Sequence, residues 1–292
     1  MIYSKWLRLV ALSVFALLSL SACDDDEGEI QADNEVGEFV IKFDNKVGSS
    51  EMRLSELSST DYAYTTNSGQ PFNLTLFGYY ISKIKLEGPD GELYEDEMNV
   101  SPNPDEVEGY YHVLESNTPS QRITLENVPA GKYNKITFTV GIEEEGVQEG
   151  AAGGILDPAA GAWFWNWNAG YIGFAMEGGS PNSPQQFEDF GGGFFIPESA
   201  FQIHVGGWKD ITPAEGEPQR FVNNNRTITL DFDSEVRVSE SLRPEAHIVA
   251  DALKALGDDI NFEETFSVHA PFKGAAFANK LEDAFIFDHT HQ

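Results

Sequence analysis

The sequence contains very little cysteine and few basic residues, and both shortages limit what the protein can be. Its 292 residues include one cysteine, so no disulfide within the chain can stabilise the fold. Lys and Arg number 18 against 48 Asp and Glu, which gives a formal net charge of −30. Such a chain lacks the basic face that binds phosphate backbones or anionic lipid headgroups. The composition therefore excludes nucleic acid as a partner and favours cations.

Long hydrophobic segments are also scarce. The apolar run at 9–20 follows Lys5 and Arg8 and is about a dozen residues long, which is too short to span a bilayer but typical of a signal peptide. It leads into Leu20-Ser21-Ala22-Cys23, which resembles the lipobox of bacterial lipoproteins. The resemblance implies cleavage before Cys23 and diacylation of its thiol. We therefore expect residues 1–22 to be a lipoprotein signal peptide, and the lipid to be the only attachment to a membrane.

An acidic segment follows the cysteine. Asp24-Asp25-Asp26-Glu27 resembles an export signal of some surface lipoproteins, and it also suits a solvated tether. Because residues 23–37 lack apolar periodicity, we expect them to form a flexible tether. The predicted location is the outer membrane, on its periplasmic face or at the cell surface.

The sequence lacks the short motifs that mark common catalytic sites. It has no G-x-S-x-G, no phosphate-binding P-loop and no H-E-x-x-H. The acidic stretch 231–235 lacks the glycine of an EF-hand calcium loop. A hydrolase therefore has no motif behind it in this sequence.

Apolar and polar residues alternate with a period of two through much of the remaining chain. This pattern predicts strands with one buried face at 39–43, 72–76, 136–140 and 228–232, and in the second of these it places Leu76 in the core. Turn residues at 88–91 and 129–131 separate such segments. The prediction is an all-β fold, an antiparallel β-sandwich or barrel-like structure, in a single domain at 38–292.

Two features interrupt the strand pattern. Residues 143–198 are rich in glycine and aromatics and predict a long loop insertion between strands. Near the C-terminus, helical spacing predicts one helix at 248–256, between Pro244 and Gly257, and a second at 274–285, where Phe277, Leu281 and Phe285 repeat every four residues.

Within the predicted insertion, Trp163, Trp165 and Trp167 lie two residues apart between Gly161 and Gly170. In an extended segment the three indoles would share one face, because side chains alternate. A cluster of this kind indicates either a binding site or an aromatic minicore that closes the mouth of a barrel.

The histidines supply a second candidate site. In the predicted strand 201–205, Gln202 and His204 point away from the core face. His289 and His291 share one side of an extended tail, a spacing that can chelate one metal ion but also fits a solvated end. His112 and His247 have no such neighbours in the sequence and are predicted to be structural or exposed, whereas His269 is left undecided.

These residues together resemble the MbnP-like family of copper-binding proteins, which is named for the methanobactin operon. The segments that carry the resemblance are Val128-Pro129-Ala130-Gly131-Lys132-Tyr133, Val140-Gly141-Ile142, Leu156-Asp157-Pro158, Trp165-Asn166-Trp167-Asn168-Ala169-Gly170-Tyr171, Glu177-Gly178, Phe201-Gln202-Ile203-His204-Val205-Gly206-Gly207 and Phe285-Ile286-Phe287-Asp288-His289-Thr290-His291. The resemblance implies a secreted copper-binding protein, not an enzyme, whose partner is a di-haem protein (MbnH-type) related to bacterial cytochrome c peroxidases. That partner would oxidise a tryptophan to kynurenine, which then holds copper together with histidines.

Applied to this chain, the resemblance implies that Trp165 is the modified residue, with Trp167 as the second choice. His204 is the leading copper ligand, followed by His289, His291 and Gln202, and Trp163 and Tyr171 line the site. The chain departs from the pattern at Trp167 and Gln202, where methanotroph relatives have histidines, and at Trp163, where the family is expected to have Met. Either His289 and His291 complete the site with His204, or the site is altered.

The main alternative is a surface glycan-binding lipoprotein that uses the three tryptophans as a stacking platform. It explains the aromatic cluster and the lipid anchor, but not the histidines.

Overall fold

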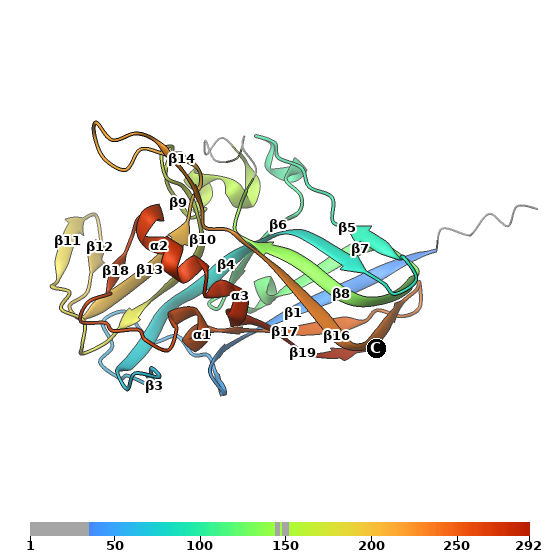
Figure 1. The fold of residues 1–292 in the computed structure, drawn as a ribbon, viewed down its shortest axis with the longest axis horizontal. Helices are drawn as coiled ribbons and strands as arrows, with labels where there is room; N and C mark the ends of the chain where they lie inside the picture. The colour runs from blue at the N-terminus through green and yellow to red at the C-terminus, as the bar shows by residue number, and fades with distance from the viewer. Residues whose placement is uncertain (1–34, 144–146, 148–151) are drawn as a thin grey trace, which may run out of the picture. The chain divides into compact units, whose positions relative to one another are not determined.

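Two β-sheets enclose a shared apolar core in the computed structural model, which describes residues 35–143, 147 and 152–292 (Figure 1). The predicted signal peptide, Cys23 and the acidic segment lie outside the described residues. Within the described chain, the smaller sheet has the order β19-β17-β1-β2, with β7 also paired to β1. Its strands are β1 (Val36–Val47), β2 (Ser50–Glu51), β7 (Arg122–Pro129), β17 (Glu245–Asp251) and β19 (Phe285–His291).

The larger sheet has the order β16-β8-β4-β10-β13-β18 among the described residues, with β3, β5 and β6 paired to β4 and β9 paired to β10. Its strands are β3 (Tyr64–Thr65), β4 (Pro71–Glu87), β5 (Leu93–Glu95), β6 (Tyr110–Leu114), β8 (Gly131–Val140), β9 (Phe164–Asn166), β10 (Gly170–Gly179), β13 (Ala200–Gly206), β16 (Arg226–Val238) and β18 (Ser267–Val268). Two separate hairpins are β11 (Glu188–Gly191) with β12 (Phe194–Ile196), and β14 (Trp208–Ile211) with β15 (Arg220–Asn223). The α-helices are α1 (Ala252–Leu256), α2 (Pro271–Ala278) and α3 (Leu281–Ala284).

The core lies between the facing surfaces of the two sheets. The ring of Phe43 from β1 lies 5.6 Å from Tyr79 of β4 and 5.8 Å from Phe138 of β8, both edge-on. All three side chains are fully buried. These contacts join the sheets into one sandwich, which confirms the predicted all-β fold. No helix in the described part of the chain is long and apolar enough to cross a membrane.

The predicted strands are present, but β4 differs from the expected register. Glu177 of β10 pairs with Leu76, whereas the next residue, Gly178, pairs with Leu74, so Thr75 is an extra residue in the ladder. This β-bulge moves Leu76 to the outer face and gives its predicted place in the core to Phe77. Beyond the bulge, Gly78 and Tyr80 also point outward, away from the shared core.

The predicted helix at 248–256 is wrong in its first half. Residues 245–251 form β17, which pairs in parallel with β1 and antiparallel with β19. Ala246, Ile248 and Ala250 are buried, with more exposed residues between them, which is strand alternation. The helix α1 begins only at Ala252, where the carboxylate of Asp251 accepts a hydrogen bond from the backbone N–H of Leu253.

The predicted helix at 274–285 is divided. The chain forms α2 and α3, and Phe285 opens β19. Phe277, Leu281 and Phe285 are nevertheless all buried. Their spacing therefore identified core positions correctly, but it placed them in one continuous helix.

The predicted loop insertion at 143–198 is also wrong, because it contains a central strand. β10 runs between β4 and β13 in the larger sheet, and nearly all of it is buried. Because β10 is covered on both faces, its sequence does not alternate between apolar and polar residues. The period-two pattern therefore does not predict it. Its glycines reflect close packing, since a Cβ at Gly178 would lie 1.9 Å from the carbonyl oxygen of Asn73.

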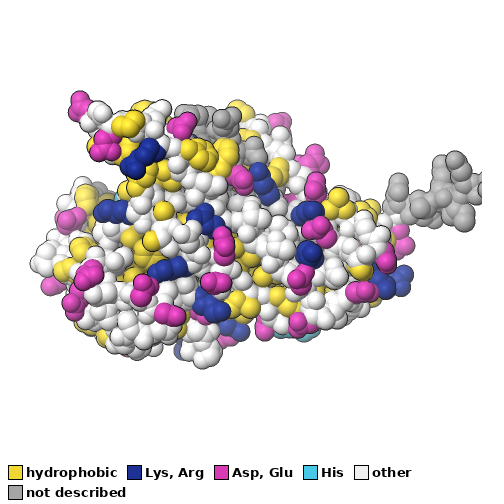
Figure 2. Space-filling view, in the orientation of Figure 1, with side chains coloured by type: hydrophobic (Ala, Val, Ile, Leu, Met, Phe, Trp, Pro, Cys, Tyr) yellow, Lys and Arg dark blue, Asp and Glu magenta, His cyan; other side chains and the backbone are white. Residues whose placement is uncertain are grey.

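A second, smaller apolar cluster covers part of the outer face of the larger sheet. It consists of Tyr80, Tyr110, Ile142, Val147, Ala152, Leu156 and Tyr171, with Trp163 and Phe164 packed against it. Elsewhere on the surface, acidic and basic side chains are interspersed, and hydrophobic side chains gather at the top of the view near β14 (Figure 2).

Candidate metal centre

The outer face of β10 and β13 carries the histidine that the strand pattern singled out. Ile203 and Val205 belong to the shared core, and His204 lies on the opposite face, as predicted. Across the ladder His204 pairs with Ala175, and Ala175 pairs with Gly78 of β4. The small residues beside His204 leave space on this face for rings from other segments.

The imidazole of His204 is held by a carboxylate. Its Nε2 lies 2.7 Å from Oε1 of Glu177, and the Nε2 amide of Gln202 donates to the same oxygen at 3.3 Å. Because an ionised carboxylate only accepts hydrogen bonds, this contact places the proton on Nε2 and leaves the Nδ1 lone pair available. That Nδ1 atom is buried and has no hydrogen-bond partner within the described residues. Gln202 thus supports Glu177 rather than facing the free nitrogen.

His269, which the sequence left undecided, lies next to His204. β18 pairs in parallel with β13, with Val268 opposite Ile203, so the following residue reaches the side chain of His204. The two imidazole centroids are 4.6 Å apart. Partial burial and the adjacent His204 lower the pKa of His269, although Glu177 acts in the opposite direction. His269 is therefore neutral at pH 7, the state that binds a metal ion.

Trp165 completes this group. It lies in β9, which pairs with the start of β10, and its ring is 6.0 Å from that of His269. The indole Nε1 is buried and has no hydrogen-bond partner among the described residues. The structure therefore gathers Trp165, His204 and His269 from three separate segments, with two ring nitrogens whose hydrogen-bonding capacity is unused.

The other predicted aromatic residues have different surroundings. Trp163 packs edge-on against His112, with ring centroids 4.4 Å apart, and belongs to the smaller apolar cluster. Tyr171 is buried in that same cluster and its hydroxyl donates to the carbonyl of Leu156, so its predicted place in the lining of the site is wrong. Trp167 is 69% exposed.

A cavity of about 850 Å³ opens beside the histidine pair. Glu177, Gln202, His204 and His269 lie along its wall. The loop around Ser58 and the β11–β12 hairpin contribute other parts of the lining. The cavity gives solutes access to the neighbourhood of His204.

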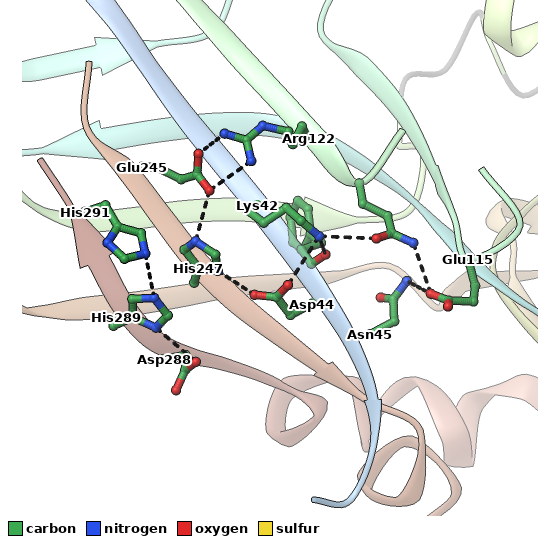
Figure 3. A network of polar contacts seen from close by, with 12 residues as sticks. Lys42, Asp44, Asn45, Glu115, Arg122, Glu245, His247, Asp288, His289 and His291 are labelled. Atoms are coloured by element: carbon green, nitrogen blue, oxygen red, sulfur yellow. Dashed lines mark hydrogen bonds and ion pairs between the residues drawn. The ribbon is translucent and has the colours of Figure 1, made fainter. Parts of the chain in front are cut away.

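The tail histidines do not join His204. His289 and His291 lie on β19 and gather with His247 of β17 on the outer face of the smaller sheet (Figure 3). His204 lies on the outer face of the larger sheet, and the shared core separates the two faces. The hypothesis that the tail completes a site with His204 is therefore wrong. His247, which has no histidine neighbour in the sequence, thus has two in the structure.

Comparison with known proteins places these observations in a family. A family model described as MbnP matches residues 36–271. No curated protein matches the chain. Among solved structures, MbnP from Methylosinus trichosporium is similar at 15% sequence identity, covering 78% of this chain and 80% of that one, with a TM-score of 0.47.

Proposed function

The chain belongs to the MbnP family, and from this premise we propose that it is an extracytoplasmic copper-binding protein whose site is formed by Trp165, His204 and His269. The observation that carries the proposal is the buried Nδ1 of His204, which has no partner in the described chain while Glu177 holds the opposite nitrogen at 2.7 Å. A carboxylate behind a histidine is the usual way in which proteins orient a metal-ligating imidazole.

The donor set suits copper. Neutral imidazoles bind copper well, and Cu²⁺ has the highest affinity among divalent first-row ions for a given set of nitrogen ligands. Two histidines alone make an incomplete site, so a third donor is needed. Trp165 in a modified form is a candidate, because its ring lies 6.0 Å from that of His269 and its nitrogen has no hydrogen-bond partner among the described residues.

Oxidation of Trp165 to kynurenine would supply that donor. Cleavage of the bond between C2 and C3 of the indole would leave a ketone at C3, and hydrolysis would then release C2 as formate and free an aromatic amine. We propose that a di-haem peroxidase-like partner performs this oxidation with two molecules of hydrogen peroxide, each of which supplies one oxygen atom and is reduced to water. Trp167 is the less favourable position, since its indole is 69% exposed and makes no ring contact with a histidine of the described chain.

An acidic chain with a lipobox-like Cys23 suits a lipoprotein of the outer membrane that acquires or handles copper. Copper is then cargo to be bound and passed on, and the protein needs no catalytic activity of its own.

The glycan-binding alternative gains no support from the arrangement of the indoles. A stacking platform needs several exposed, coplanar rings. Trp163 packs edge-on between other rings and the Nε1 atom of Trp165 is buried, which leaves Trp167 as the most exposed of the three.

Two measurements test the copper proposal. Mass mapping of peptides from residues 155–178, in protein from its native host, should find kynurenine at Trp165. Titration with copper should show at least tenfold weaker binding for His204→Ala, or about 1.4 kcal/mol. His112→Phe is a matched control, because His112 lies on the same face and contacts Tyr80 and Trp163 instead. Unchanged copper affinity in His204→Ala would contradict the proposed site.

A further inference from the structure

Three histidines converge on the outer face of the smaller sheet, away from the site described above. His247 and His289 are directly opposite each other on β17 and β19, and their rings stack with centroids 4.3 Å apart. The ring of His291 meets both of them edge-on, at 5.1 Å from His247 and 4.7 Å from His289. One ring nitrogen from each residue lies within 4.8 Å of those from the other two.

A β-bulge in β19 creates this convergence. Phe287 pairs with Ile248 and His289 pairs with His247, so Asp288 is an extra residue in the ladder. In an unbroken strand, Phe287 and His289 would point to the same face. Phe287 packs against the core beside Phe232, at 5.2 Å between ring centroids. The bulge therefore turns His289 and His291 outward to meet His247, a use of bulges that is common at functional sites.

Carboxylates contact two of the three rings. Nδ1 of His247 lies 2.6 Å from Oδ2 of Asp44, and Nδ1 of His289 lies 3.0 Å from Oδ2 of Asp288 (Figure 3). A carboxylate behind a ring nitrogen orients an imidazole toward a metal ion, and here Asp44 and Asp288 lie behind His247 and His289.

The spacing of the nitrogens suits one metal ion. Nε2 of His289 and Nε2 of His291 are 3.1 Å apart. With metal–nitrogen distances of about 2.0–2.1 Å, that separation corresponds to an angle of about 98° at a shared ion, between the values for square and tetrahedral coordination.

The charges around the cluster also favour a cation. Nε2 of His247 lies 2.9 Å from Oε1 of Glu245, which places a carboxylate oxygen beside the same space. Glu245 also pairs with Arg122, and Asp44 pairs with Lys42 at 3.2 Å. Together with Asp288, three acidic groups face two basic ones in this network.

We propose that His247, His289 and His291 form a second metal site, for a divalent first-row cation such as Zn²⁺ or Cu²⁺, with Glu245 as an additional oxygen ligand. The site shares no residue with the group around His204, and β19 lies beyond the segment 36–271 that the family model matches. It therefore does not depend on the proposed function. Figure 2 shows histidine side chains at the surface at the lower edge of the view, where β19 runs in Figure 1.

Calorimetric titration of the purified protein, prepared without a polyhistidine tag, tests the site with Zn²⁺ as the probe. The double variant His289→Ala/His291→Ala should lose one equivalent of bound Zn²⁺, and His247→Gln should bind that equivalent at least tenfold more weakly. Thr290→Ala, which changes the residue between the two histidines, is the matched control and should bind as the unchanged protein does.

The variant His204→Ala/His269→Ala separates this proposal from the proposed function, since it should keep the equivalent that the tail variants lose. The tail histidines are exposed on a strand at the edge of the smaller sheet, so their removal should leave the unfolding temperature nearly unchanged. If the double tail variant binds Zn²⁺ with the stoichiometry and affinity of the unchanged protein, the second site does not exist.

Discussion

Acid should destabilise the folded protein through His112, and replacing this residue with phenylalanine should remove that effect. His112 is in β6, on the face of the larger sheet that also carries the candidate copper site. Its imidazole stacks on Tyr80 at 4.1 Å between centroids and meets Trp163 edge-on at 4.4 Å. Its Nε2 atom is buried without a hydrogen-bond partner among the described residues, so a proton added there gains no partner.

The magnitude follows from the pKa. Burial lowers the pKa of His112 from 6.5 to about 4. Between these values the unfolded chain takes up a proton that the folded chain does not, so stability falls as the pH falls through this window. Each pH unit of such a difference is worth about 1.4 kcal/mol, and from pH 7 to pH 5 the loss from this one group is about 2 kcal/mol.

Urea unfolding at pH 7 and pH 5 measures this loss. In His112→Phe the difference in free energy of unfolding between the two pH values should be about 2 kcal/mol smaller than in the unchanged protein. His112→Gln should show the same smaller difference, with lower stability at both pH values because it loses the contacts with Tyr80 and Trp163. The acidic residues contribute alike to all three proteins. A full pH dependence in both variants would refute the reasoning.

One further change tests how the candidate copper site is built, and another tests the packing beside Trp163. Glu177→Gln removes the charge that fixes the tautomer of His204, and it should weaken copper binding about 10–100-fold in a titration without loss of folding; unaltered affinity would show that Glu177 does not orient the ligand. Gly78→Ala would place a Cβ 2.6 Å from the carbonyl oxygen of Val113 and 3.0 Å from the Trp163 ring. It should lower the free energy of unfolding by about 1–3 kcal/mol and shift the tryptophan fluorescence; a variant as stable as the parent would argue against close packing here.

Strand alternation predicted the strands of the fold, but it did not predict for every residue whether the side chain faces the core. It placed Phe39, Ile41 and Phe43 in the core and His204 outside it, because a strand covered on one side must alternate. It failed at Leu76, since a single extra residue in the ladder exchanges the two faces. The sequence of one strand does not show where such an extra residue lies, because a bulge is defined by the pairing with the neighbouring strand.

The position of His269 beside His204 could not be predicted for a related reason. The signal at His204 was local, in the alternation of its own strand. His269 reaches it through parallel pairing of Ser267 and Val268 with β13, a contact between segments far apart in the sequence. A strand of two residues is too short to show alternation, so the sequence does not predict this pairing.

The tail histidines show what sequence spacing can and cannot establish. His289-Thr290-His291 predicts that two imidazoles share one side of a strand, and they do. The spacing does not say which layer of the sandwich that strand joins. A filled core between two sheets prevents side chains on the two outer faces from meeting, so histidines on β13 and β19 belong to separate groups. The question for this chain is therefore whether one protein holds metal at two independent places, which titration of the paired variants answers directly.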